Sequence, residues 1–169
     1  MLAGMGMAQD IRLARRDDAP AIARMSRDQI ELGLGWSWTA PRVLRSIADA
    51  QTNVVVLPAP TGGLAGFGIM KYHEDEAHLL LLAVQRGLQR CGFGSALVAW
   101  LEASAQVAGV GQIYLEARAS NAAARAFYRH LGYREIQQVE GYYSGREASV
   151  RLARDLWLQR PQPGAVRED

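Results

Sequence analysis

Seven short stretches of the chain combine apolar and β-branched residues between turn-forming residues, a pattern typical of β-strands. They cover residues 11–13, 53–57, 64–72, 77–84, 112–118, 134–139 and 147–156. Four other segments repeat apolar residues about every 3.6 positions, which predicts helices with one buried face. These segments cover residues 20–34, 41–47, 92–108 and 121–131. The resulting order of strands and helices predicts a mixed α/β layer structure.

The segment 77–131 predicts how part of the sheet is connected. It contains a strand, a glycine-rich loop, a helix, a second strand and a second helix. Such a crossover is right-handed and joins parallel neighbours, so strands 77–84 and 112–118 are expected side by side and parallel. The three strands between residues 53 and 84 are separated by short turns and should form an antiparallel meander.

Length, composition and charge fit one ordinary globular domain. Of the 169 residues, 49% are apolar and 21% are charged. We expect a single domain over residues 10–157, with flexible termini at 1–9 and 158–169. The 19 basic and 17 acidic residues give a net charge of +2, too little to indicate a nucleic-acid partner. The sequence contains no run of 18 apolar residues, so it predicts no membrane-spanning helix.

Cysteine and histidine usage argues against a metal site. Cys91 is the only cysteine, and the three histidines at positions 73, 78 and 130 match no zinc-ligand spacing. A single cysteine cannot form an internal disulfide, which suits a reducing compartment. We therefore expect a cytoplasmic protein without a metal.

A glycine-rich loop, residues 89–95, lies between the strand 77–84 and the next helix. Free N–H groups of a first helical turn form a phosphate site when glycines allow close approach, and Arg90 adds a charged donor. The loop lacks the lysine of a P-loop, and Leu97 stands where a dinucleotide fingerprint needs glycine or alanine. Glycine at a helix start also has a purely steric explanation, so the loop alone leaves both interpretations open.

Two motifs carry a resemblance to a known family. The loop reads Gln89-Arg90-Cys91-Gly92-Phe93-Gly94, and residues 115–124 are followed by Phe127-Tyr128 and Leu131-Gly132-Tyr133. The loop resembles the pyrophosphate loop, Gln/Arg-x-x-Gly-x-Gly/Ala, of the GCN5-related N-acetyltransferase (GNAT) superfamily. The second motif is most similar to that of the ribosomal-protein alanine N-acetyltransferases, and Gly141-Tyr142-Tyr143 resembles a tyrosine pair found late in those enzymes.

The resemblance implies a fold and a cofactor. The fold is α/β, with a mixed central sheet of about seven strands in the order β-α-α-β-β-β-α-β-α-β-β, flanked by four helices. The cofactor is acetyl-CoA as co-substrate, whose acetyl group a primary amine attacks directly. The implied cofactor contacts are Leu82, Ala83, Val84 and Asn121 at the pantetheine arm and Gln89, Arg90, Cys91, Gly92, Phe93, Gly94 and Ser95 at the pyrophosphate. A central strand is apolar in any case, and helix capping alone would also explain Asn121.

The resemblance also implies two catalytic residues, Glu116 and Tyr128. Glu116 would accept the proton of the amine, directly or through water, most effectively if desolvation raised its pKa toward neutrality. An ion pair with Arg118 on the same strand face is the alternative. Tyr128 would protonate the departing thiolate as general acid, although an aromatic residue at a helical position is more often part of a core.

Several other residues need an interpretation. His78 stands where related enzymes often carry an acid, and we interpret it as a strand-edge side chain rather than a second base. Cys91 is interpreted as incidental. Trp36 and Trp38 either flank the entrance for the substrate or cover the edge of the core. The final strands and Trp157 are candidates for a homodimer edge.

The acceptor amine is not selected by the sequence. One hypothesis is the α-amine of a protein N-terminus, whose pKa near 8 leaves a useful neutral fraction at pH 7. The other is a small-molecule amine such as an amino acid, an antibiotic or a polyamine. A non-catalytic acyl-CoA sensor is a third hypothesis, from a different functional class.

Overall fold

Seven strands of the computed structural model form one mixed sheet, in the spatial order β1-β2-β3-β4-β5-β7-β6. The structure describes residues 10–141 and 147–157. In this part of the chain the strands are β1 (Arg12–Leu13), β2 (Thr52–Pro58), β3 (Leu64–Tyr72), β4 (Glu76–Val84), β5 (Gln112–Arg118), β6 (Arg134–Val139) and β7 (Ser149–Asp155). The helices are α2 (Ala19–Met25), α3 (Ala40–Ala48), α4 (Phe93–Val107) and α5 (Ala122–His130), with the shorter turns η2 (Arg16–Asp18) and η3 (Ser26–Ile30).

This order confirms the predicted mixed α/β fold, with a difference in the first predicted helix. Helix α2 ends at Met25, and the π-helical turn η3 continues only to Ile30, whereas the apolar pattern predicted a helix to residue 34. Gly33 has a φ of +80°, which does not continue a helix. Leu34 is consequently 51% exposed and does not lie on a buried helical face.

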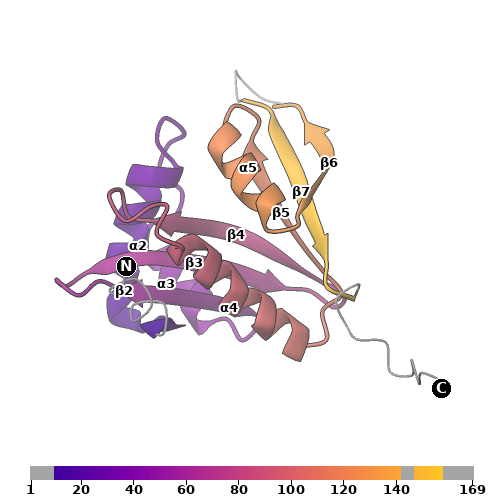
Figure 1. The fold of residues 1–169 in the computed structure, drawn as a ribbon. Coiled ribbons are helices and arrows are strands. Elements are labelled where there is room, and N and C mark those ends of the chain that lie inside the picture. Colours follow the sequence, from indigo (N-terminus) through magenta and orange to yellow (C-terminus); the bar gives the residue numbers. More distant parts are fainter. Residues whose placement is uncertain (1–9, 142–146, 158–169) are drawn as a thin grey trace.

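Helices cover both faces of the sheet (Figure 1). Leu97 and Leu101 of α4 and Tyr128 of α5 belong to one apolar cluster on the first face. Ile22 of α2 and Val43 of α3 belong to a second cluster on the opposite face. The two clusters sandwich the sheet, which explains why its central strands are apolar on both sides.

A β-bulge interrupts β4. The antiparallel ladder pairs Ile69 with Leu81 and Met70 with Leu79, which leaves Leu80 as an extra residue in β4. Such a bulge bends the strand and changes the face to which later side chains point. Leu79 therefore packs in the cluster under α4, whereas Leu81 packs in the cluster under α2 and α3.

Strands β4 and β5 are parallel neighbours only at one end. Their ladder joins Glu76 to Gln112, Ala77 to Ile113 and His78 to Tyr114. The predicted parallel pairing of 77–84 with 112–118 is confirmed at this end, and beyond it the strands diverge (Figure 1). The sheet thus has two arms. The first arm is β1–β4 with α2, α3 and α4, and the second arm is β5–β7 with α5.

A buried ion pair connects the two arms. Glu102 on α4 bonds to Arg154 on β7, and their side chains are only 11% and 17% exposed. Burial raises the pKa of the Glu102 carboxyl, and the charge of Arg154 opposes this rise. Because β4 and β5 form only a short ladder, this pair helps to fix α4 against the second arm.

We predict that Glu102→Ala destabilises the fold strongly, because it leaves the Arg154 guanidinium buried without its carboxylate. Breaking a buried pair costs about 3 kcal/mol or more, which urea unfolding followed by circular dichroism would measure. Asp28→Ala is the control, because it breaks a solvent-exposed pair with Arg27 and should leave the stability nearly unchanged. Equal losses for the two variants would contradict a bracing role for the buried pair.

Candidate active site

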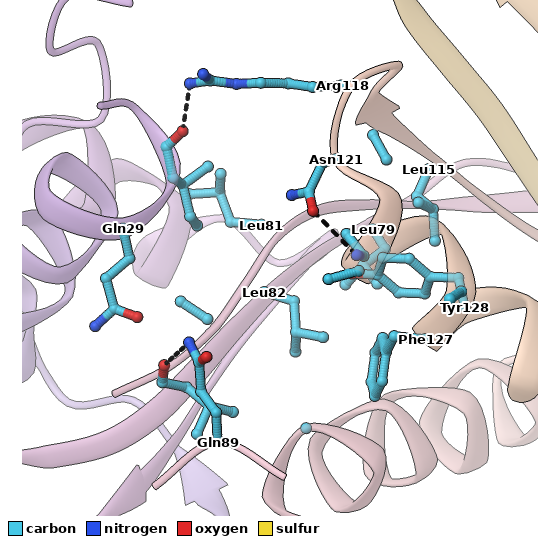
Figure 2. A pocket seen from close by; sticks show the side chains of 18 of the residues that line it. Gln29, Leu79, Leu81, Leu82, Gln89, Leu115, Arg118, Asn121, Phe127 and Tyr128 are labelled. Carbon is cyan, nitrogen blue, oxygen red and sulfur yellow. Dashed lines mark hydrogen bonds between the residues drawn. The ribbon is translucent and has the colours of Figure 1, made fainter. Parts of the chain in front are cut away.

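A cavity of about 1100 Å³ lies between the diverging strands β4 and β5. Both arms line it, and Figure 2 shows Phe127 and Tyr128 on one side of Leu82 and Gln29 on the other. This volume lies at the upper end of the range for small-molecule sites, so the cavity can hold a ligand the size of a nucleotide cofactor. Among the residues predicted from the sequence, those that line the cavity are Leu82, Ala83, Val84, Gln89, Arg90, Gly92, Gly94, Ser95, Glu116, Asn121 and Tyr128.

The glycine-rich loop forms one end of the cavity. Helix α4 begins at Phe93, after Gly92 with a φ of +83°, and no described side chain caps this helix start. Its first N–H groups therefore remain available for an anion. Gly94 lies against α5, because a Cβ at this position would be 3.2 Å from Cζ of Phe127. A larger residue would require the Phe127 ring or the first turn of α4 to shift.

Arg90 has an unusual backbone conformation within this loop. Its φ of +63° is the only positive value of a non-glycine residue in the described chain. This left-handed conformation costs about 1–2 kcal/mol, and such strain occurs often at functional sites. The Gln89 side chain donates a 3.2 Å hydrogen bond to the Val84 carbonyl, which ties the loop to the end of β4 (Figure 2).

Phe93 and Cys91 were predicted to contact the pyrophosphate, but their side chains lie outside the cavity lining. Phe93 is 3% exposed and packs in the core cluster under α4, so its side chain is a core residue. Cys91 is exposed, and its Sγ lies 3.6 Å from the Gln89 carbonyl. Neither residue lines the cavity, although Phe93 contributes the first backbone N–H of α4.

Helix α5 carries the aromatic wall of the cavity. It begins after Asn121, whose Oδ1 accepts a 3.0 Å hydrogen bond from the Ala124 N–H (Figure 2). Tyr128 is only 9% exposed, and burial raises the pKa of its phenol, so the hydroxyl stays protonated at neutral pH. Phe127, the neighbour of Tyr128 in the second motif, packs against the core and also lines the cavity.

Glu116 is held by donors on both neighbouring strands. Its Oε2 accepts a 2.6 Å hydrogen bond from Nε2 of His78, and its Oε1 accepts bonds from Nε and Nη2 of Arg151 at 3.1 and 2.9 Å. These contacts use three of the roughly four lone-pair positions of a carboxylate. One position, on Oε2, is therefore left for an amine or a water.

These donors favour the ionised form of Glu116. The hydrogen bond from His78, followed by the smaller effects of Arg151, holds the pKa of Glu116 below its usual range, and burial opposes this only in part. The condition under which Glu116 would be most effective as a base, a pKa raised toward neutrality, is therefore not met. The alternative ion pair with Arg118 is also absent among the described contacts, because Arg118 instead donates to the carbonyls of Ile30 and Leu32.

The contacts of Glu116 with His78 and Arg151 were not predicted from the sequence, which singled out His78 only as a strand-edge side chain. His78 is the last β4 residue of the short ladder, and its ring stacks on Tyr114 with centroids 4.3 Å apart. Arg151 lies directly opposite Glu116 in the β5–β7 ladder, and its guanidinium is 5.1 Å from the Tyr114 ring. Only the pairing of β5 with β7 reveals this contact, because the two residues are far apart in the chain.

The second face of the cavity, on the side of Leu82 away from Phe127 and Tyr128, is formed by η3 and the loop that follows it. It is lined by Gln29, Ile30, Leu32 and Leu34. Trp36 and Trp38 do not line it. Trp38 is 8% exposed in the cluster under α2 and α3, and the Arg42 guanidinium lies 3.9 Å from its ring centre. Trp36 donates from Nε1 to the Ala23 carbonyl at 3.2 Å. Both contacts agree with a role at the edge of the core.

Other sequence expectations concern residues at the margins. Tyr142 and Tyr143 lie outside the described residues. Over residues 10–141 and 147–157, no three His, Cys, Asp or Glu side chains are grouped as metal ligands would be. The same part of the chain has no helix long and apolar enough to cross a membrane.

This chain belongs to the acetyltransferase (GNAT) family, whose sequence profile matches residues 22–133. It is similar to the ribosomal protein bS18-alanine N-acetyltransferase of Escherichia coli K12, with 41% identity over 95 residues. That match covers 54% of this chain and 64% of the relative, so it spans less than two thirds of the relative's length.

Solved structures agree with the family assignment. The crystal structure of the ribosomal-protein-S18-alanine N-acetyltransferase from Escherichia coli superposes with a TM-score of 0.73 at 32% identity, over 86% of this chain and 92% of that chain. Arabidopsis thaliana NAA60 in complex with acetyl-CoA also superposes with a TM-score of 0.73, over 86% of this chain and 97% of that chain. At 16% identity, the second likeness shows the fold alone.

We predict that His78→Ala raises the pKa of Glu116, because the hydrogen bond from His78 is the largest effect on that carboxyl. Carbon-13 NMR titration of the carboxyl carbon measures the shift, with His130→Ala as a control on the exposed end of α5. The folded pKa lies below the unfolded one. Glu116 thus stabilises the fold above the unfolded pKa, and this stabilisation is lost as the pH falls through the folded pKa. An unchanged titration in His78→Ala would contradict the assigned cause.

Proposed function

We propose that this protein transfers the acetyl group of acetyl-CoA to a primary amine, and that the amine is the N-terminal α-amine of a protein. The observation that carries the proposal is the cavity between β4 and β5. It is lined by the start of α4, by Tyr128 and by Glu116. An anion site, a protonated phenol and an ionised carboxylate along one channel suit acetyl transfer from a phosphate-bearing thioester.

The residues present fit acetyl-CoA. The uncapped start of α4 at Gly92 and the Arg90 side chain would hold the pyrophosphate. Beyond His78, the facing edges of β4 and β5 do not pair with each other, so the pantetheine amides would find backbone partners along β4. Asn121 would contact the arm with its amide nitrogen, because its Oδ1 is used in the helix cap.

The proposed reaction forms one C–N bond and breaks one C–S bond. The amine nitrogen attacks the thioester carbonyl and loses one proton to Glu116, and the departing CoA sulfur gains one proton through Tyr128. Glu116 has a lowered pKa, so it is too weak a base for an ammonium group whose pKa is near 8. It accepts a hydrogen bond from the neutral amine and takes the proton after attack, when the nitrogen is far more acidic.

Tyr128 acts at the departing sulfur in this proposal. Its raised pKa makes it a poor source of a free proton but a stable hydrogen-bond donor. Such a donor stabilises the developing thiolate in a site with little water. In a concerted relay the phenol gives its proton to the sulfur while it receives one from solvent, so no free phenolate forms.

The lining of the second face favours a peptide over a polyamine. Gln29, Leu32 and Leu34 are uncharged, and Arg118 is cationic. Glu116 is the only carboxylate among the described residues that line the cavity, and Arg151 already neutralises it. A polyamine would need several free carboxylates, whereas a peptide α-amine needs one acceptor and an apolar wall. The similarity to alanine N-acetyltransferases supports the same acceptor.

We predict that acetyl-CoA at about 100 times its dissociation constant stabilises the protein by about 2.7 kcal/mol, a shift of a few degrees in thermal melting. ATP and NADPH are the ligand controls and should shift the melting temperature less than acetyl-CoA does. Arg90→Gly should reduce the acetyl-CoA shift without lowering the unliganded melting temperature, because glycine accepts the φ of +63° at no steric cost. Arg45→Ala, an exposed arginine on α3, should leave the shift unchanged. A full shift in Arg90→Gly would contradict the phosphate site.

We predict that the protein acetylates an alanine-starting peptide and leaves the same peptide with a blocked α-amine untouched. Glu116→Gln and Tyr128→Phe should each lower kcat about 100-fold, while the thermal shift with acetyl-CoA persists. Thiol release is the measurement. Because Glu116 stays ionised and Tyr128 stays protonated near neutrality, kcat/KM should rise with pH along one limb near the amine's pKa of about 8.

The controls separate the alternatives. Tyr72→Phe removes a phenol hydroxyl outside the cavity lining and should keep full activity. Turnover of free alanine or spermidine without turnover of the peptide would favour a small-molecule acceptor. Cofactor binding without transfer to any amine would overturn the proposal in favour of an acyl-CoA sensor.

A further inference from the structure

The loop between η3 and α3 is anchored at its base by a buried carboxylate. Glu31 is 8% exposed, and it accepts hydrogen bonds from Oγ of Ser26 at 3.0 Å, from the Ser37 N–H at 2.7 Å and from the Trp38 N–H at 3.2 Å. These donors lie on both sides of the loop tip, residues 32–35. The tip is therefore a closed structure with fixed ends.

The loop tip is apolar and projects into solvent. Leu32 is 62% exposed and Leu34 is 51% exposed, yet both line the cavity. Gly33 and Gly35 have φ values of +80° and +76°, which produce the sharp turns on either side of Leu34. Exposing two leucines at the mouth of a cavity has no benefit for the fold, because neither buries its side chain.

Arg118 connects this loop to the opposite arm. It ends β5, lines the cavity, and donates from Nη2 to the Ile30 carbonyl at 2.8 Å and to the Leu32 carbonyl at 3.1 Å. Figure 2 shows its side chain reaching from β5 toward the turn that carries Gln29. The short β4–β5 ladder ends at His78, so Arg118 bridges the arms far from the ladder. Charged donors make the stronger hydrogen bonds, which suits a latch over an open gap.

We propose that Arg118 is a positioning residue for the acceptor. Its guanidinium latches the loop tip to β5, so that Leu32 and Leu34 form a fixed apolar wall for the residues that follow the reacting amine. This inference rests on the proposed function, because it concerns the acceptor of the same reaction. Its consequence is that apolar residues after the N-terminal one are preferred, and that losing the latch weakens acceptor binding while the chemistry proceeds.

The test compares Arg118→Ala with Arg129→Ala in peptide acetylation at saturating acetyl-CoA. Arg129 is the matched control because its side chain is 52% exposed on α5 and pairs with Glu135 outside the cavity lining. Arg118→Ala should raise KM for an alanine-leucine-starting peptide roughly tenfold, with kcat and the acetyl-CoA thermal shift changed less than about twofold. Arg118→Lys should restore part of the affinity, because an ammonium still donates to these carbonyls.

A second measurement follows the loop itself. Hydrogen–deuterium exchange of residues 30–36 should become several-fold faster in Arg118→Ala and stay at the wild-type rate in Arg129→Ala. This readout needs only folded protein, and Arg118→Lys provides a milder variant if the alanine variant folds poorly. An unchanged KM in Arg118→Ala, or an equal loss of kcat and of cofactor binding, overturns the positioning role. A wild-type protein that acetylates no peptide overturns the proposed function instead.

Discussion

The early end of the β4–β5 ladder is the constraint on which the rest of the structure depends. Backbone N–H and C=O groups in a sheet need partners, and these two strands pair through only three residues each. The bulge at Leu80 bends β4 just after the last pair at His78. The gap that opens is the cavity, and its edges present backbone groups that a neighbouring strand would otherwise use. A ligand with amides of its own can take that strand's place.

Three side-chain contacts join the two arms where the β4–β5 ladder is missing. Glu116 of β5 bonds to His78 of β4 at the last ladder pair. Arg118 joins the end of β5 to η3, and Glu102 of α4 pairs with Arg154 of β7. All three are charge-assisted contacts between parts of the chain distant in sequence. They hold the arms at a fixed spread while leaving the space between them unfilled. An apolar contact could not do this, because packing side chains across the gap would close it.

Features that depend on neighbours in sequence were predictable. The strands, the helix start at Gly92 and the cap at Asn121 follow from local spacing and backbone chemistry. Features that depend on register were not. The run of leucines at 79–82 has no period from which a bulge follows, and the partners of Glu116 and Arg118 come from β7 and from the loop after η3. Charge alone suggested the wrong pair, because Arg118 shares a strand face with Glu116 but turns toward carbonyls.

The environments of Glu116 and Tyr128 move their pKa values in opposite directions. Donors on a partly exposed carboxylate keep it ionised, and apolar burial keeps the phenol protonated. In the proposed reaction neither group has to change its charge before the amine attacks. The carboxylate becomes a competent base only once the new C–N bond makes the nitrogen acidic, and the phenol matters only once charge develops on sulfur. Proton movement is thereby tied to bond formation, so the reaction depends on how well the acceptor is positioned between them.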